Sequence, residues 1–156
     1  MKTPPLLPSV LVTGSVASIV SAVTIAALAK LEGNRAAQPL NATSHWLHGD
    51  NAARIGGIDA RHTGVGLVTH HASALFWALP FETWLSVRPP QSSISLLRDG
   101  AVMSAIAATV DYGVVPRRLT PGWELTLSKR SMTGAFVGLA LGLAAGAYIT
   151  RRIQQN

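Results

Sequence analysis

The chain contains no cysteine. This absence excludes disulfide bonds, thiolate metal sites and iron–sulfur clusters held by cysteine. A metal ion bound by this protein would therefore take its ligands from histidine, aspartate and glutamate side chains.

Charged residues are also scarce. Of 156 residues, only 13% are Asp, Glu, Lys or Arg, whereas 48% are hydrophobic; soluble domains usually carry about 25% charged residues. The net charge is +6, but Lys and Arg never form a run longer than two. We therefore interpret the basic residues as anchors at a membrane surface, and we expect no nucleic-acid partner.

The sequence contains four long apolar segments. Four windows match the roughly 20 residues needed to cross a hydrocarbon core of about 30 Å, and we place spans at about 8–31, 63–86, 95–115 and 131–150. The sequence predicts an all-α, polytopic integral membrane protein: one membrane domain over 1–156, folded as a four-transmembrane-helix bundle. The first span exceeds the 7–15 apolar residues of a signal peptide, so we expect it to be retained.

Four spans put the two chain ends on one side of the membrane and the loops at about 32–62 and 116–130 on the other. The two loops and their borders carry eight Lys and Arg residues, against five on the side of the chain ends. Cytoplasmic loops are usually the more basic ones. This pattern favours cytoplasmic long loops in a bacterial inner membrane.

The loops contain signals for short elements and for the membrane interface. Residues 43–50 predict a short amphipathic helix in the first loop, with Thr43 or Ser44 as its cap. In the later loop, the order Thr120-Pro121 predicts the start of the next helix. We expect three tryptophans to be interfacial anchors, namely Trp46, Trp84 and Trp123.

Small residues recur every four positions in the last span, at Gly134, Gly138, Gly142 and Gly146. This glycine zipper forms a flat ridge that lets another helix approach closely. The first span has a similar face that includes Gly14 and Ser18. Two interpretations remain open: the ridges pack the bundle itself, or they dock a partner protein or a second copy of the chain.

The second span carries titratable groups at His70, His71 and Glu82. Such groups are costly in lipid unless they are paired or hydrated, so they are candidate functional residues. Helix direction places both histidines at a depth similar to that of Asp111 in the third span. At the opposite surface, we expect Glu82 to join a charge cluster with Arg88, Arg98 and Asp99.

Three roles compete for the histidine and aspartate cluster. Asp111 could hold the second span to the third through a hydrogen bond or ion pair. The same region could relay protons through His70, His71 and Asp111, or it could bind a metal ion of unknown identity. The candidate metal ligands are His45, His48, His70, His71 and Asp111. We do not expect a haem held by histidines of two spans, because only the second span contains histidine.

The chain has no Gly-rich phosphate loop, no Ser-His-Asp order and no His-Glu-x-x-His motif, so no enzyme class is predicted. The leading hypothesis is a non-catalytic accessory or structural subunit that packs in a larger membrane complex. Its expected partners are membrane lipid and a membrane protein or another copy of itself. The alternatives are a redox protein that binds a metal or cofactor through the cluster, and a small proton or solute conductor.

Overall fold

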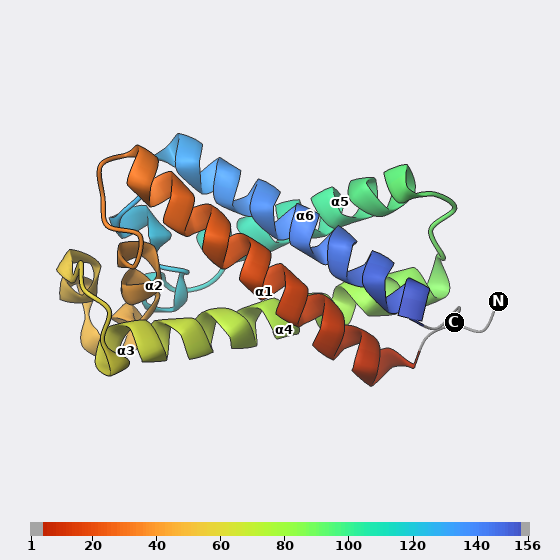
Figure 1. Ribbon diagram of the computed structural model, residues 1–156, viewed down its shortest axis with the longest axis horizontal. Helices are drawn as coiled ribbons and strands as arrows, with labels where there is room; N and C mark the ends of the chain where they lie inside the picture. The colour runs from red at the N-terminus through yellow and green to blue at the C-terminus, as the bar shows by residue number, and fades with distance from the viewer. Residues whose placement is uncertain (1–4, 154–156) are drawn as a thin grey trace.

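The computed structural model describes residues 5–153, which form helices and turns with no strand among them. Four long helices build the molecule: α1 (Leu6–Leu31), α4 (Val65–Val87), α5 (Ser93–Gly113) and α6 (Lys129–Ile153) (Figure 1). Short elements occupy the two loops: α2 (Gln38–Thr43), α3 (His45–His48), η1 (Asp50–Arg54), η2 (Ala60–Gly64), η3 (Arg117–Leu119) and η4 (Trp123–Leu125). The all-α prediction is confirmed, and each long helix overlaps its predicted span.

The long helices run alternately in opposite directions. Both long loops lie at one end of the molecule, which we call the loop end; the start of α1, the end of α6 and the connection at 88–92 lie at the other, the terminal end (Figure 1). This is the arrangement expected when successive helices cross the same layer.

Three of the long helices, α1, α5 and α6, are long and apolar enough to cross a membrane by length and composition. The sequence predicted four spans, so hydropathy supports the polytopic architecture but not the span at 63–86. Helix α4 has 23 residues, a sufficient length. Its mean hydropathy is lowered by His70, His71 and Glu82.

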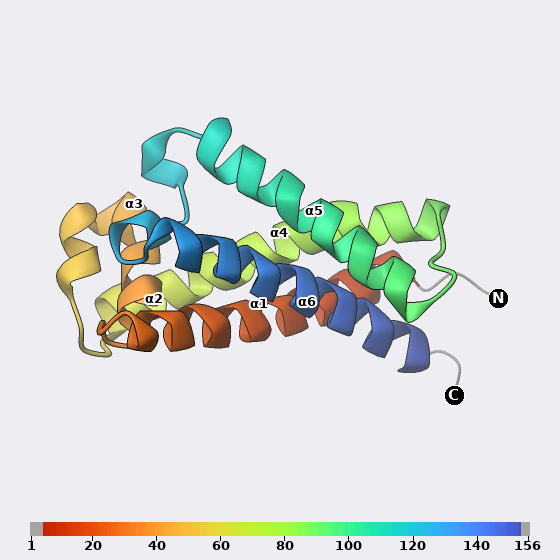
Figure 2. The same ribbon diagram turned by 90° about the horizontal axis from the view of Figure 1, so that it is seen from above.

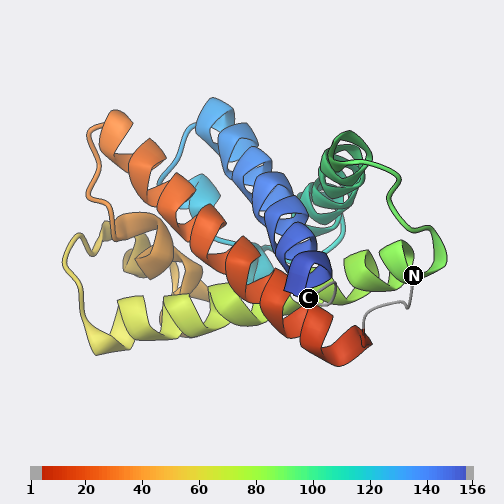
Figure 3. The same cartoon turned by 45° about the vertical axis from the view of Figure 1, so that its right-hand side comes forward.

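Helices α1 and α6 form the most extensive helix pair and lie side by side (Figure 3). A Cβ atom added at Gly142 would lie 2.6 Å from the Cα of Ala17, and one added at Gly146 would lie 2.6 Å from the Cα of Thr13. The glycine ridge therefore lets the two backbones touch. At Gly142 and Gly146 the ridge faces α1 of the same chain.

The other helices flank this pair. Helix α4 packs on α1, where Gly14 faces Leu75, and α5 packs on α6, where the hydroxyl of Ser104 donates to the carbonyl of Phe136 at 2.6 Å. Helices α4 and α5 make few contacts with each other, and α5 diverges from α4 towards the loop end (Figure 2).

The loops differ from the sequence expectation at two points. The helix predicted at 43–50 is divided at Ser44. This residue occupies the N-cap position of α3, but its hydroxyl donates backwards to the carbonyl of Asn41 at 2.7 Å and makes no capping bond to α3. The last long helix begins at Lys129 and not near Thr120, since only the short η4 follows Pro121.

Glu32 joins the end of α1 to the start of α6. Its carboxylate accepts hydrogen bonds from the hydroxyls of Ser128 and Ser131 and from the backbone N–H of Ser128. These bonds hold the pKa of the Glu32 carboxyl below its usual range. The contact holds α1 to α6, the helix that carries the glycine ridge.

The charges of the terminal end pair differently from the expected cluster. Glu82 is 3% exposed; it accepts a hydrogen bond from Thr13 at 2.6 Å and pairs with Arg151 at 3.3 Å. Asp99 pairs instead with its neighbour Arg98 at 2.8 Å. Glu82 thus connects α4 to α1 and α6, a contact that helical phase in one segment does not reveal.

Candidate functional site

A pocket of about 320 Å³ lies at the loop end. Its wall includes residues of all four long helices and of both loops, and it therefore brings together segments far apart in sequence. The polar members of the wall are Ser21, Thr43, Thr69, His70, Ser73, Asp111 and Thr120, and its three indoles are those of Trp46, Trp77 and Trp123. Ser73 and Leu119 are exposed, so the pocket opens to the surface.

His70 is the buried imidazole of the pocket, at 5% exposure. Its Nε2 lies 3.0 Å from the hydroxyl oxygen of Ser21 and 3.2 Å from the carbonyl oxygen of Ser18. Because a carbonyl only accepts, we assign the ring proton to Nε2. In the neutral imidazole Nδ1 is then an acceptor, and it makes no hydrogen bond within residues 5–153.

Asp111 supplies the carboxylate of the pocket, from the last turns of α5. Within the described chain it takes part in no ion pair and in no hydrogen bond of ordinary geometry, although the indole of Trp77 is close enough to act on it as a donor. Among the described residues, no Lys or Arg lines the pocket. The prediction that His70 and Asp111 lie at similar depth agrees with their place in one wall.

Four of the five hydroxyl groups of the wall, all except that of Ser73, donate their protons within the described residues. Ser21 donates to the carbonyl of Ala17 at 2.7 Å, and Thr43 and Thr69 donate to carbonyls one turn earlier in their own helices. Thr120 donates to the carboxylate of Glu124 at 2.5 Å. Each of these oxygens therefore offers lone pairs, and not a proton, to anything in the pocket.

The indoles give the pocket an aromatic wall. Trp46 donates its indole N–H to Thr69 at 3.1 Å. Trp123 was predicted as an interfacial anchor, but it is only 5% exposed. The centroid of its ring lies 5.9 Å from that of the His70 ring and 5.6 Å from that of the Phe136 ring. Its indole N–H has no partner in the described residues and almost no accessible surface, so it adds no donor to the pocket.

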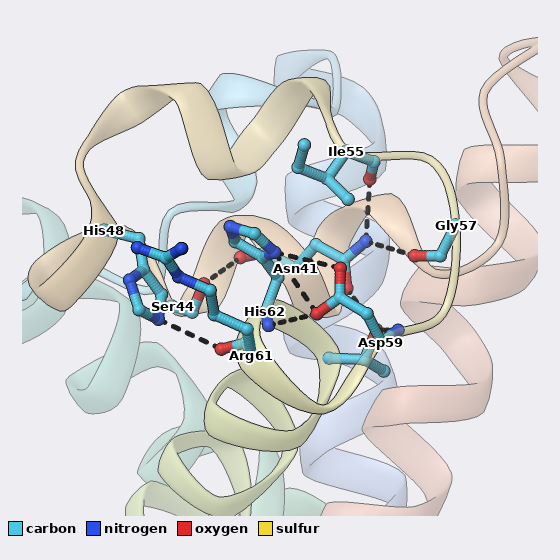
Figure 4. Close-up of polar contacts among 9 residues, drawn as sticks. Asn41, Ser44, His48, Ile55, Gly57, Asp59, Arg61 and His62 are labelled. Atoms are coloured by element: carbon cyan, nitrogen blue, oxygen red, sulfur yellow. Dashed lines mark hydrogen bonds and ion pairs between the residues drawn. The ribbon is translucent and has the colours of Figure 1, made fainter.

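Two other histidines, His48 and His62, make contacts within the loop at 32–62. His48 Nε2 lies 3.0 Å from the carbonyl oxygen of Arg61, and its ring packs on that of His62 (Figure 4). The backbone N–H and Nδ1 of His62 both lie within hydrogen-bond distance of Asp59, which caps η2. The bonds from His62 hold the pKa of the Asp59 carboxyl below its usual range.

His45 links the two loops. Its Nε2 lies 3.0 Å from the carbonyl oxygen of Thr120, and its Nδ1 lies 3.6 Å from Asp50, whose carboxylate also pairs with Arg117 at 2.9 Å. These contacts hold the loop at 116–130 over the loop at 32–62 and thereby close one side of the pocket.

The five predicted metal ligands are consequently divided among separate environments. His70 and Asp111 line the pocket, His45 and His48 bind loop carbonyls, and His71 is half-buried outside the pocket wall. Within residues 5–153 no group of three or more His, Asp or Glu side chains is close enough to hold a metal ion.

The sequence reasoning missed the part of the wall that comes from the loops, including Thr43 and Thr120. A pattern of one residue in each of several loops has no period, so no sequence signal marks it. Comparison of the chain with protein-family models, with curated proteins and with solved structures gives no match. The geometry of the pocket is therefore the basis for inferring function.

Proposed function

We propose that this protein is a four-span integral membrane protein that binds a small molecule in the pocket at its loop end, without transforming it. The observation that carries the proposal is the pocket itself. Its volume of about 320 Å³ falls within the range of small-molecule sites, and a mostly apolar wall with a few convergent polar groups is typical of them.

Burial supports α4 as the fourth span. His70 and Glu82, which lower its hydropathy, are 5% and 3% exposed, so lipid would not contact them. The exposed side chains of the same helix include Val68, Phe76 and Leu79. A helix with inward polar groups and an apolar outer face is suited to cross a bilayer inside a bundle.

The interior of α4 favours binding over conduction. Between His70 and Glu82 the buried residues of this helix are Ala74, Trp77, Ala78 and Phe81. An apolar layer of this kind separates the polar groups of the loop end from those of the terminal end. A proton or solute path would need polar groups or water across that layer.

Tryptophan fluorescence offers a direct test, because three of the four tryptophans line the pocket. The protein in lipid nanodiscs is titrated with small aromatic amphipaths of positive, neutral and negative charge. We expect a saturable change with at least one of them. The pocket-filling substitution Ser73→Leu abolishes this change, whereas Ala72→Leu, at an exposed position outside the wall, leaves it intact. The absence of any saturable change, or binding unaffected by Ser73→Leu, contradicts the proposal.

A second candidate is the accessory subunit, now with a different docking face. The glycine ridge is covered by α1, but an apolar groove of about 480 Å³ lies open between α5 and α6, lined by small residues such as Ala101, Ala105 and Ala108. Small residues favour the approach of a further membrane helix. Substitution of Ala105 by Leu should then abolish co-purification of a membrane partner or self-association, and unchanged assembly contradicts this role. The bacterial inner membrane and cytoplasmic long loops remain part of the proposal.

A further inference from the structure

The charge of the pocket wall determines the sign of the ligand charge it can hold. Among the lining residues, Asp111 is the one carboxylate, His70 is the one imidazole, and there is no Lys or Arg. A carboxylate without an ion pair in a mostly apolar site attracts a cation, because a counter-ion lowers the cost of its partial burial. An anionic ligand would be repelled by the Asp111 carboxylate.

Most hydrogen-bonding groups of the wall are acceptors, so they suit a ligand that donates hydrogen bonds. The hydroxyls of Ser21, Thr43 and Thr69 have given their protons to backbone carbonyls, and the Nδ1 of His70 makes no hydrogen bond within residues 5–153. The oxygens of Ser21 and Thr69 each lie within hydrogen-bond distance of one ring N–H, so each keeps one lone pair for a ligand. Together with the Asp111 carboxylate, these groups give the wall more acceptors than donors, since Ser73 supplies its one undonated hydroxyl proton among the described residues. A ligand that offers several N–H groups satisfies these acceptors, whereas a ligand rich in acceptors does not.

The aromatic rings complete the recognition of a cation. Trp46, Trp77 and Trp123 line the same pocket as Asp111. Tryptophan is the side chain whose ring face attracts a cation most strongly, and the attraction grows when the cation is removed from water. Apolar neighbours such as Phe136 and Leu139 would contact a hydrocarbon or aromatic body attached to that cation.

The geometry points to a protonated amine with an apolar body as the ligand of this pocket. The inference rests on the proposed binding function and specifies the chemical class of its ligand. Asp111 is the counter-ion of the ammonium group. The N–H groups of the ammonium donate to the wall hydroxyl oxygens and to Nδ1 of His70, and the indole rings contact the cation. Both a free amphipathic amine and the amine headgroup of a membrane lipid have this chemistry.

The test uses three probes of similar size in phosphatidylcholine nanodiscs: phenethylamine, 2-phenylethanol and 3-phenylpropionate. We expect phenethylamine to change the tryptophan fluorescence saturably, with an affinity at least about tenfold higher than that of the alcohol, since a desolvated cation adds a carboxylate contact and a cation–π contact. The propionate is expected to bind more weakly than the alcohol.

Asp111→Asn tests the counter-ion at nearly constant shape. We expect it to remove the advantage of phenethylamine while leaving the affinity for 2-phenylethanol unchanged. The matched control is Asp99→Asn, which removes a carboxylate from the same helix but outside the pocket. It should leave the binding of all three probes unchanged. Retained binding of the alcohol by Asp111→Asn also shows that the variant is folded.

Two results overturn the ligand assignment: equal affinities of the unchanged protein for the amine and the alcohol, or an amine preference that survives Asp111→Asn. In either case the saturable, Ser73-dependent binding of a neutral probe would still support the proposed function. If no probe of any charge binds, both the assignment and the proposed function are wrong.

The lipid composition of the nanodiscs distinguishes the two possible sources of the amine. In nanodiscs that contain phosphatidylethanolamine, a lipid headgroup that occupies the pocket would compete with phenethylamine and weaken its apparent affinity. An unchanged affinity would indicate a free amphipathic amine as the natural ligand. Both outcomes require the ammonium preference already measured, so both support the assignment.

Discussion

Substitution of Gly142 by Ala tests the packing of α1 against α6. The added Cβ would lie 2.6 Å from the Cα and 3.2 Å from the carbonyl oxygen of Ala17, whereas ordinary contacts begin at 3.4 Å. The obstacle is backbone, so no side-chain rotation relieves it and the helices must separate by nearly an ångström. Overpacking of this kind costs about 1–3 kcal/mol, and the better helix propensity of Ala returns up to about 1 kcal/mol.

We therefore expect Gly142→Ala to lower the free energy of unfolding by up to about 2 kcal/mol, and to be about 1–3 kcal/mol less stable than an alanine variant of the same helix without the clash. The assay is reversible unfolding in mixed micelles, followed by circular dichroism. Gly134→Ala is the matched control in the same helix, because its Cβ would meet only the flexible end of Leu28 at 3.2 Å. It gains the same helix propensity without a backbone clash, so it should be neutral or stabilising by up to about 1 kcal/mol.

Two results would refute the reasoning on the ridge. One is a Gly142→Ala variant as stable as the Gly134→Ala variant. The other is a variant that keeps its stability but loses self-association or a membrane partner. The second result would mean that the ridge contacts another chain and that the α1–α6 pair is not formed through it.

Three further predictions concern the charged contacts. Glu82→Gln should destabilise the protein by on the order of 3 kcal/mol in the same assay, because it leaves Arg151 largely buried without its counter-ion; adding Arg151→Gln should cost less than the sum of the single changes. Folding lowers the pKa of Glu32, so its stabilisation of the protein should be complete above the pH at which a free glutamate titrates. It should be lost as the pH falls through the lowered pKa. Glu32→Gln should therefore reduce the decrease in stability at acid pH. Asp50→Asn should cost less than about 1 kcal/mol, since the ion pair with Arg117 is exposed; a larger loss would mean that His45 also depends on this carboxylate.

The sequence was sufficient for the long helices, because each is an apolar run ended by polar or turn-forming residues. The depth argument also placed His70 and Asp111 near each other, since it needs only the direction of successive spans. Pairings that depend on tertiary packing could not be predicted. The burial of Trp123 follows from the loop at 116–130 folding over the bundle, and the charged partner of Glu82 comes from a helix about 70 residues away in sequence.

Hydropathy does not identify α4 as a span for a related reason. A window average counts His70 and Glu82 as if lipid surrounded them, but both are buried against α1. The structure locates these polar groups, and it is their inward position that makes a fourth span physically reasonable.

The central claim, a bundle in which α4 crosses the membrane, is tested most directly by the sidedness of two loops. The chain has no cysteine, so single-cysteine variants at Asn51 and at Gln91 each carry a unique thiol. In sealed, uniformly oriented vesicles, a membrane-impermeant maleimide should label these two positions from opposite sides. Labelling of both from the same side would show that α4 does not cross, and it would contradict the four-span account.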